Sequence, residues 1–439
     1  MINLTGFATW SPRAASRLLL LAGICLLTFA ALIDPADEIF HLKVPAFALV
    51  MLVWILRRGL ARPTVTPATW IIVITVAMVI PALWSMLGLA HQNIHGPDLM
   101  FGLFKAFLFL LLVLVIITED IDLASLLIRM SPLVALLTFV MVIASFVFPP
   151  VFAALYAFSL EKNNAIISTS RDLLGIGLGQ FYYKTSCLLI FPLSWYCSRA
   201  TQPGPGRLRS LLLCLLYGAA LLFSGARANY LGGLFIAGFF FIGYLGRKIG
   251  RVPALIVALA AVILFTSVLA SKLANPTETS NSIKLRHVQS YEQEFNEHPS
   301  ILLWGQGADT AYYTEGFRDW TTTTELSYLE LVRIFGVPMT ALFIVGLAAL
   351  AYKILRDRQY AVGIAFVTYL VMSGSNPLLV SSTGFLAVCA VWKEAESTST
   401  GKSAFHLSAP PLSAHRRASR RAIALPEAAR AGGPEPDVL

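Results

Sequence analysis

The sequence has few charged residues for its length, and this shortage excludes a soluble globular protein. Of its 439 residues, 13% are Asp, Glu, Lys or Arg, whereas 57% are hydrophobic, and the mean hydropathy is +0.72. A soluble domain needs a polar exterior, which so few charges cannot provide. The charges are clustered between long apolar runs, as expected of a chain that crosses a bilayer many times.

The sequence also lacks the motifs of metal and nucleotide chemistry. It contains no P-loop, no HExxH and no Cys-x-x-Cys pair. His91 and His95 are four residues apart, but they fall on a predicted short loop. We therefore expect no metal and no cofactor, and we interpret the five cysteines, which stand in or beside apolar runs, as small hydrophobic residues: Cys25, Cys187, Cys197, Cys214 and Cys389.

The apolar runs predict an all-α fold, a polytopic transmembrane bundle. Runs such as 107–117 are continuous, whereas the strands of a membrane β-barrel alternate apolar and polar residues. No small-residue cleavage site clearly follows the first run, which therefore predicts a span and no signal peptide. About twelve spans are expected, at residues 17–33, 44–56, 68–90, 99–118, 131–148, 185–198, 208–224, 228–245, 252–270, 326–351, 359–374 and 377–393.

The distribution of basic residues predicts the orientation of these spans. Lys and Arg gather in alternate connections, which the positive-inside rule places in the cytoplasm. Both termini are then cytoplasmic, and the net charge of +9 reflects orientation without a nucleic-acid partner. The basic residues concerned are Arg13, Arg17, Arg57, Arg58, Arg62, Arg129, Arg199, Arg207, Arg209, Arg247, Lys248, Arg251, Lys353, Arg356 and Arg358.

Three regions are expected to make up the chain. Residues 1–393 form the membrane domain, and within it residues 271–325 form a large extracytoplasmic loop with short helices. Residues 394–439 are rich in Ser, Ala, Pro and Arg, which predicts a disordered basic cytoplasmic tail. The tail's arginines suit anionic lipid headgroups, or simply anchor the orientation.

Arg227 is the first candidate for chemistry, because it stands between two apolar runs among small residues. An arginine near hydrocarbon is costly, and small neighbours let a ligand approach the backbone. A guanidinium beside the start of a helix suits an anion. An arginine that simply extends to interfacial water is the alternative.

Three further segments carry candidate residues. Lys284 and Arg286 lie near the start of a predicted amphipathic helix, His298, Trp304, Gly305 and Gly307 follow it, and Glu325 and Tyr328 lie at the start of the tenth span. Trp304 is suited to stack on a sugar or to anchor at the interface, and Glu325 to act as a base or to pair with an arginine. A solvated helix and an ordinary first-turn carboxylate are the alternatives.

Taken in order, these segments resemble the O-antigen polymerase and O-antigen ligase superfamily over roughly residues 160–345. The elements are a Ser-x-Arg turn, a long outward loop with a second arginine, a His-Pro…Gly-x-Gly signature and a Glu-x-x-Tyr-Leu segment: Ser224 to Arg227, Arg286, His298-Pro299 to Gly307, and Glu325 to Leu329, followed by Arg333 and Gly336. Ala228 stands where family members often have glycine after the turn's arginine. Glu325 and Leu326 stand where the ligase branch usually carries His and Asn, which favours the polymerase branch.

The resemblance implies a metal-independent glycosyltransferase that polymerises undecaprenyl-pyrophosphate-linked repeat units on the periplasmic face. Its substrate is the lipid-linked glycan within the bilayer, and a chain-length regulator is an open possibility as partner. Arg227 and Arg286 would stabilise the departing pyrophosphate, and Glu325 would act as base. The remaining residues would contact phosphate or sugar: Arg171, Lys184, Lys284, His298, Trp304, Gly305, Gly307 and Tyr328.

Two other functions compete with polymerisation. A ligase would transfer the finished glycan to a lipid or protein acceptor. A flippase or transporter of the same glycolipid belongs to another class, and it is expected to carry charges in a central cavity, whereas the predicted spans are almost free of charge. The sequence does not specify the sugars, the linkage, its stereochemistry or the oligomeric state.

Overall fold

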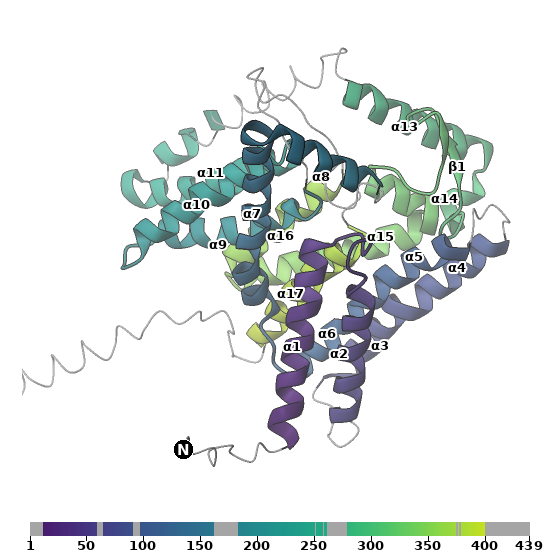
Figure 1. The fold of residues 1–439 in the computed structure, drawn as a ribbon, viewed down its shortest axis with the longest axis horizontal. Helices are drawn as coiled ribbons and strands as arrows, with labels where there is room; N and C mark the ends of the chain where they lie inside the picture. The colour runs from purple at the N-terminus through teal and green to yellow at the C-terminus, as the bar shows by residue number, and fades with distance from the viewer. Residues whose placement is uncertain are drawn as a thin grey trace, which may run out of the picture.

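The computed structural model describes residues 12–58, 65–90, 97–161, 183–250, 252–257, 259–260, 279–374, 376 and 379–399, nearly all of them helical (Figure 1). His91 and His95, the predicted phosphate contact Arg171 and the tail beyond residue 399 lie outside the described residues. Most of the ninth predicted span and the start of the long loop lie outside them as well.

The described N-terminal half of the chain consists of helices joined by short non-helical connections. One π-helical stretch, η1, and one 3-10 stretch, η2, interrupt otherwise continuous apolar helices. The elements are α1 (Pro12–Ile33), α2 (Lys43–Arg58), α3 (Pro67–Ile74), η1 (Thr75–Val79), α4 (Ile80–Ala90), α5 (Pro97–Leu108), η2 (Phe109–Leu111), α6 (Leu112–Thr118), α7 (Leu123–Val147) and α8 (Pro149–Glu161).

The C-terminal half contains the remaining apolar helices and a small mixed layer of helix and hairpin. Its elements are η3 (Ser186–Leu189), α9 (Ile190–Ala200), α10 (Arg207–Phe223), α11 (Arg227–Ile249), α13 (Thr279–Glu297), α14 (Ser300–Trp304), β1 (Tyr312–Thr314), β2 (Asp319–Thr321), α15 (Ser327–Arg356), α16 (Tyr360–Ser373) and α17 (Ser382–Ser399). The two strands pair antiparallel, with Tyr313 opposite Trp320.

The exterior of the helical bundle is apolar, which identifies a membrane-embedded protein. Large aliphatic side chains point outward from several helices; Leu56 of α2 is 67% exposed and Val371 of α16 is 73% exposed. Water would penalise such a surface, whereas lipid does not. Among the residues that the structure describes, five helices are long and apolar enough to span a bilayer: α1 from Ala14, α3 to α4 with η1, α7, α11 and α15.

Polar contacts gather at the two ends of the bundle. At one end, here called the first rim, Arg57 donates to Ser16 at 2.6 Å and forms an ion pair with Glu119 at 2.9 Å. Lys393 of α17 pairs with Asp120 at 2.5 Å beside the end of α6. The ends of α1, α2, α6 and α17 are thus joined there.

The opposite ends of the same helices meet at the second rim. Thr185 donates to the Leu32 carbonyl at 2.7 Å, and Lys43 donates to Ser382 at 3.1 Å. In Figure 1 the Pro12 end of α1 lies at the bottom, whereas α13 lies at the top above α14 and α15. The layer of α13, α14 and the hairpin therefore covers the second rim.

Helix α15 is broken at Gly336, which has φ 77° and ψ 167°. The break and the following Pro338, which lacks an N–H, leave the carbonyls of Arg333 and Ile334 without helical partners. The amides of Gln306 and Gly307 bind these carbonyls at 2.7 and 3.2 Å. The loop after α14 thereby completes the backbone bonding of a helix inside the bundle.

The structure departs from four sequence-based boundaries. Helix α7 begins at Leu123 and not at 131, because Asp122 caps it by accepting from the Ser125 amide at 2.8 Å. Residues 149–161 form a further helix, α8, between the predicted spans 131–148 and 185–198. The hairpin adds two strands to the loop that was predicted to contain short helices. Helix α17 continues to Ser399, beyond the predicted start of the tail at 394, because Glu394 and Ala395 are buried.

Candidate functional site

Arg227 is the first residue of α11 and lies at the second rim. The preceding turn needs Gly225, which adopts φ 70°, and the helix has no side-chain cap. Asn229, fully buried, donates to both Ser224 and Ser186 at 2.9 and 2.8 Å and so fixes this turn to the start of η3. A partly exposed guanidinium is thus held at a helix N-terminus, where anions are favoured.

The N-terminal part of α13 lies directly over this arginine. Arg227 Nη1 donates to Asn281 Oδ1 at 3.0 Å, and one helical turn further Lys284 Nζ lies 3.3 Å from Glu325 Oε2. Three predicted site residues, from α11, α13 and the segment before α15, are therefore brought together. The Lys284 and Glu325 side chains are 28% and 45% exposed, so the cluster is open to a ligand.

The other predicted cations lie near this cluster without a described bond to it. Lys184 is half-buried next to the turn that Asn229 holds, and burial lowers the pKa of Lys184 while the Glu38 carboxylate opposes that shift. Arg286 follows Lys284 by two residues, about 200° around the helix. Its Nε is buried and has no hydrogen-bond partner among the residues that the structure describes.

His287 joins the cationic end of α13 to the hairpin, and sequence analysis gave it no role. Its Nδ1 lies 2.6 Å from the Thr314 hydroxyl, and its ring meets Phe317 edge-on at 4.5 Å between centroids. A Cβ on Gly316 would lie 2.3 Å from the imidazole. Burial lowers the pKa of His287, with Arg286 and Lys284 acting in the same direction against Glu325 and Glu330. The buried ring is therefore neutral.

A second arginine, Arg333, lies wholly inside the protein beneath α13. It pairs with Glu330 at 2.5 Å and donates to the Gln306 side chain at 2.8 Å and to the carbonyls of Thr310 and Thr322 at 2.9 and 2.8 Å. All five guanidinium donors are satisfied. The signal for it was present in the sequence: a Glu and an Arg three residues apart in an apolar run.

Two tyrosines complete this buried cluster. Tyr291 of α13 donates to Glu330 at 2.5 Å, and the Tyr312 ring stacks under the Arg333 guanidinium at 4.6 Å. Burial and the nearby Glu330 carboxylate raise the pKa of both tyrosines, so their hydroxyls remain protonated. The cluster therefore fastens α13 and the hairpin to α15.

The glycines of the predicted Gly-x-Gly signature have a packing role. A Cβ on Gly305 would lie 2.0 Å from the Ile334 carbonyl oxygen, and one on Gly307 would lie 2.2 Å from the Gly88 amide. Both glycines have positive φ and lie where the loop passes between α4 and the break in α15. Close backbone approach accounts for both glycines, and a contact between them and substrate remains a prediction.

The remaining predicted contacts are dispersed. Trp304 is 64% exposed at the end of α14, and its carbonyl accepts from the Trp84 indole at 2.9 Å. His298 is exposed after α13. Tyr328 donates to the Leu370 carbonyl of α16 at 2.6 Å, away from Glu325. Glu325 precedes α15, whose N-cap is Leu326, so it lies just outside the helix that contains Tyr328.

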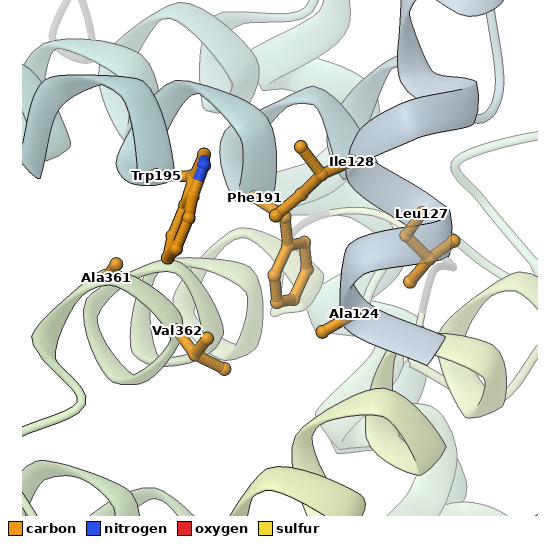
Figure 2. Close-up of a pocket in the computed structure, with 7 residues that line it drawn as sticks. All are labelled: Ala124, Leu127, Ile128, Phe191, Trp195, Ala361 and Val362. Atoms are coloured by element: carbon orange, nitrogen blue, oxygen red, sulfur yellow. The ribbon is translucent and has the colours of Figure 1, made fainter. Parts of the chain in front are cut away.

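An apolar hollow lies elsewhere in the bundle, between α7, α9 and α16 (Figure 2). Leu127, Ile128, Phe191 and Val362 line it, and the Trp195 indole closes one side. Its lining contains no ionisable group. The charged side chains of the predicted site lie instead at the second rim.

Comparison of the chain with protein-family models, with curated proteins and with solved structures gave no match. Within the described ranges, no three His, Cys, Asp or Glu side chains are grouped as metal ligands. The site is therefore assessed on its own geometry. The Arg227 cluster presents two cations and one carboxylate around an open helix N-terminus, an arrangement that can bind a phosphate group and accept a proton beside it.

Proposed function

We propose that this protein is a membrane glycosyltransferase that polymerises undecaprenyl-pyrophosphate-linked repeat units of a surface polysaccharide. One observation carries the proposal: the Arg227–Asn281 hydrogen bond of 3.0 Å brings the rim arginine under α13, next to the Lys284–Glu325 pair. A lipid-linked substrate needs an apolar surface for its tail and a cationic site for its diphosphate at the same rim, and the bundle offers both.

The chemistry assigned to these residues is a single displacement. The acceptor hydroxyl oxygen forms a bond to the anomeric carbon of the donor, and the bond from that carbon to the diphosphate oxygen breaks. The diphosphate leaves with the electron pair, and Arg227 with Lys284 or Arg286 stabilises its growing charge more than the charge of the ground state. Glu325 receives the proton of the acceptor hydroxyl.

The proposal includes a topology. We place the first rim in the cytoplasm, because Arg57 and Arg58 end α2 there, and the second rim on the periplasmic side of a bacterial inner membrane. The predicted twelve spans are reached when seven shorter segments are added to the five long spans. These segments are α2, α5 to α6, α9, α10, α16, α17 and the segment that begins at residue 252. Both termini are then cytoplasmic.

Arg227→Lys tests the assigned chemistry. A point charge replaces a planar fork, so we expect polymer to fall at least tenfold, which corresponds to one lost charge-assisted hydrogen bond of about 1.5–3 kcal/mol. Surface glycans are resolved on gels after the variant replaces the wild type in a deletion strain. Arg247→Lys, at the other end of α11, is the matched control, and immunoblots verify equal expression.

The gel pattern of the deletion strain also distinguishes a polymerase from a ligase. Single-repeat products indicate a lost polymerase, whereas accumulated lipid-linked polymer indicates a lost ligase. A normal chain-length distribution in Arg227→Lys would remove Arg227 from the mechanism. Full activity of Glu325→Gln would remove Glu325 as the base while leaving the role of the arginine intact.

A further inference from the structure

A separate cleft opens at the far end of α13, away from Arg227. It has a volume of about 260 Å³ and lies between the last turns of α13 and the hairpin. Its lining includes Glu294, Glu297, His298, Glu315 and Trp320, without any lysine or arginine. An acidic lining of this kind repels phosphate, so the cleft does not duplicate the cationic site.

Aromatic rings flank these acids. Tyr313 and Trp320 occupy opposite positions on the two strands, with ring centroids 6.3 Å apart, and are 44% and 58% exposed. Tyr312 also lines the cleft; it is buried, and its ring centroid lies 5.2 Å from that of Tyr291. Exposed rings beside carboxylates offer apolar faces together with acceptors for hydroxyl groups.

Cross-strand pairing alone would explain an aromatic pair on a short hairpin, but it does not explain the carboxylates. The side-chain amide of Gln306 donates to the Glu294 carboxylate, and the side-chain amide of Gln293 donates to the Glu297 carboxylate at 2.8 Å. Both carboxylates are therefore positioned along one wall. Glu315 lies on the opposite wall, and its backbone amide donates to the Ser290 hydroxyl at 3.0 Å. Both walls thus carry carboxylates, and those of Glu294 and Glu297 are held by hydrogen bonds.

Helix α13 connects the cleft to the cationic site. Lys284 and Arg286 lie near its start, whereas Glu294 and Glu297 lie near its end, and the rise between Lys284 and Glu297 is about 20 Å. A ligand that reaches both ends is anionic at one end and carries no negative charge at the other. Lipid-linked oligosaccharides of neutral sugars have this distribution of charge.

We propose that this cleft binds the uncharged sugars of an oligosaccharide whose diphosphate lies at Arg227. Trp320 and Tyr313 stack on sugar faces, and Glu297 and Glu315 accept hydrogen bonds from sugar hydroxyls. The inference rests on the proposed function, because that function supplies a ligand with a diphosphate at one end. It adds a second contact region that selects neutral glycans over acidic ones.

The test uses the full-length protein in lipid nanodiscs. The probe is the phosphate-free oligosaccharide released by mild acid from the surface polysaccharide of the producing bacterium, and its binding is followed by saturation-transfer NMR. Trp320→Ala and the double variant Glu297→Gln with Glu315→Gln should each weaken binding about tenfold. Glu292→Gln, an exposed residue on the same helix outside the cleft, should bind like the wild type.

Two further measurements distinguish a failure of the cleft assignment from a failure of the proposed function. Trp320→Phe keeps a cross-strand ring and should retain more binding than Trp320→Ala. Inorganic pyrophosphate should bind more weakly to Arg227→Lys and equally well to Trp320→Ala. Absent oligosaccharide binding by the wild type, or equal affinity in all cleft variants, overturns the cleft assignment. The glycan pattern of the deletion strain decides the proposed function independently.

Discussion

Arg227 and Arg333 are two arginines of one rim, but their surroundings differ in every respect that matters for function. Arg333 is fully buried, and Glu330, Gln306, Thr310 and Thr322 take up its five donors. Arg227 is partly exposed at a helix N-terminus beside Asn281. A saturated, buried guanidinium stabilises the fold, whereas an accessible one can meet a substrate.

The same difference distinguishes residues that stabilise the fold from residues that we propose to take part in the reaction. The Arg333 cluster fastens α13 and the hairpin to α15, and α13 in turn lies over Arg227. Substitutions in the buried cluster should therefore change stability, and substitutions at the open cluster should change activity at nearly constant stability. The following predictions test that separation.

Arg333→Met should have the largest effect on stability. The substitution leaves the Glu330 carboxylate buried and without its ion-pair partner, which lowers the free energy of unfolding by about 3–5 kcal/mol. Thermal unfolding in detergent, followed by size-exclusion fluorescence, should show a large fall in Tm or loss of the folded peak. Arg356→Met, exposed at the other end of the same helix, should change Tm little. An unchanged Tm for Arg333→Met would contradict the fastening role.

Gly305→Ala should have the second-largest effect, a decrease of about 2–4 kcal/mol in the free energy of unfolding. The new Cβ meets the Ile334 carbonyl oxygen at 2.0 Å, and alanine is disfavoured at φ 77°. The same Tm measurement applies. Gly346→Ala in α15, where a Cβ meets nothing within 4 Å, should instead stabilise by about 0.5–1 kcal/mol. Equal Tm shifts in the two variants would refute the close backbone approach.

His287 should make the α13 layer sensitive to acid. Folding lowers the pKa of His287 below its usual 6.5, so its contribution is complete above pH 6.5 and is lost as the pH falls from 6.5 toward the folded value. The protection factors of the α13 amides, which correct for the slower intrinsic exchange at low pH, should therefore be lower at pH 5.5 than at pH 7.5. His287→Gln should reduce that pH dependence, whereas His298→Gln, exposed after α13, should preserve it. The change in stability should be smaller than that of Gly305→Ala.

Asp309→Asn should have the smallest effect and the opposite sign. Burial raises the pKa of Asp309 from 3.8 to about 6, so its ionised form costs stability as the pH rises through 6. Asparagine tolerates the positive φ of 57° at this position. Tm should rise at pH 8, by an amount corresponding to about 1 kcal/mol after solvent screening, and should not change at pH 4. A gain that is equal at both pH values would exclude titration of Asp309 as its cause.

The helical class, the apolar exterior and the helix over 279–297 could be predicted, because they follow from composition and periodicity along neighbouring residues. The break in α15 could not, since Gly336 is tolerated only because the Gln306 and Gly307 amides approach it. The surroundings of Glu325 could not be predicted either, because the threonines before it bind residues that are distant in the sequence. The Thr324 hydroxyl, for example, lies 2.6 Å from the Tyr291 hydroxyl.

The candidate site was predicted in its members but not in its arrangement. Arg227, Lys284 and Glu325 were each identified by charge near apolar runs. Their convergence depends on the contact between Arg227 and Asn281, which are 54 residues apart in sequence. Arg333 received no role, because a charge in an apolar run indicates burial without indicating which partners surround it.

The most direct test of this account is cysteine labelling of the two rims in spheroplasts. Gln289→Cys, exposed on α13, and Arg356→Cys, exposed at the end of α15, are placed singly in a chain whose five native cysteines are replaced. A membrane-impermeant maleimide should label position 289 in intact spheroplasts and position 356 only after permeabilisation. Labelling of 356 alone in intact spheroplasts would place the Arg227 cluster in the cytoplasm and contradict the account.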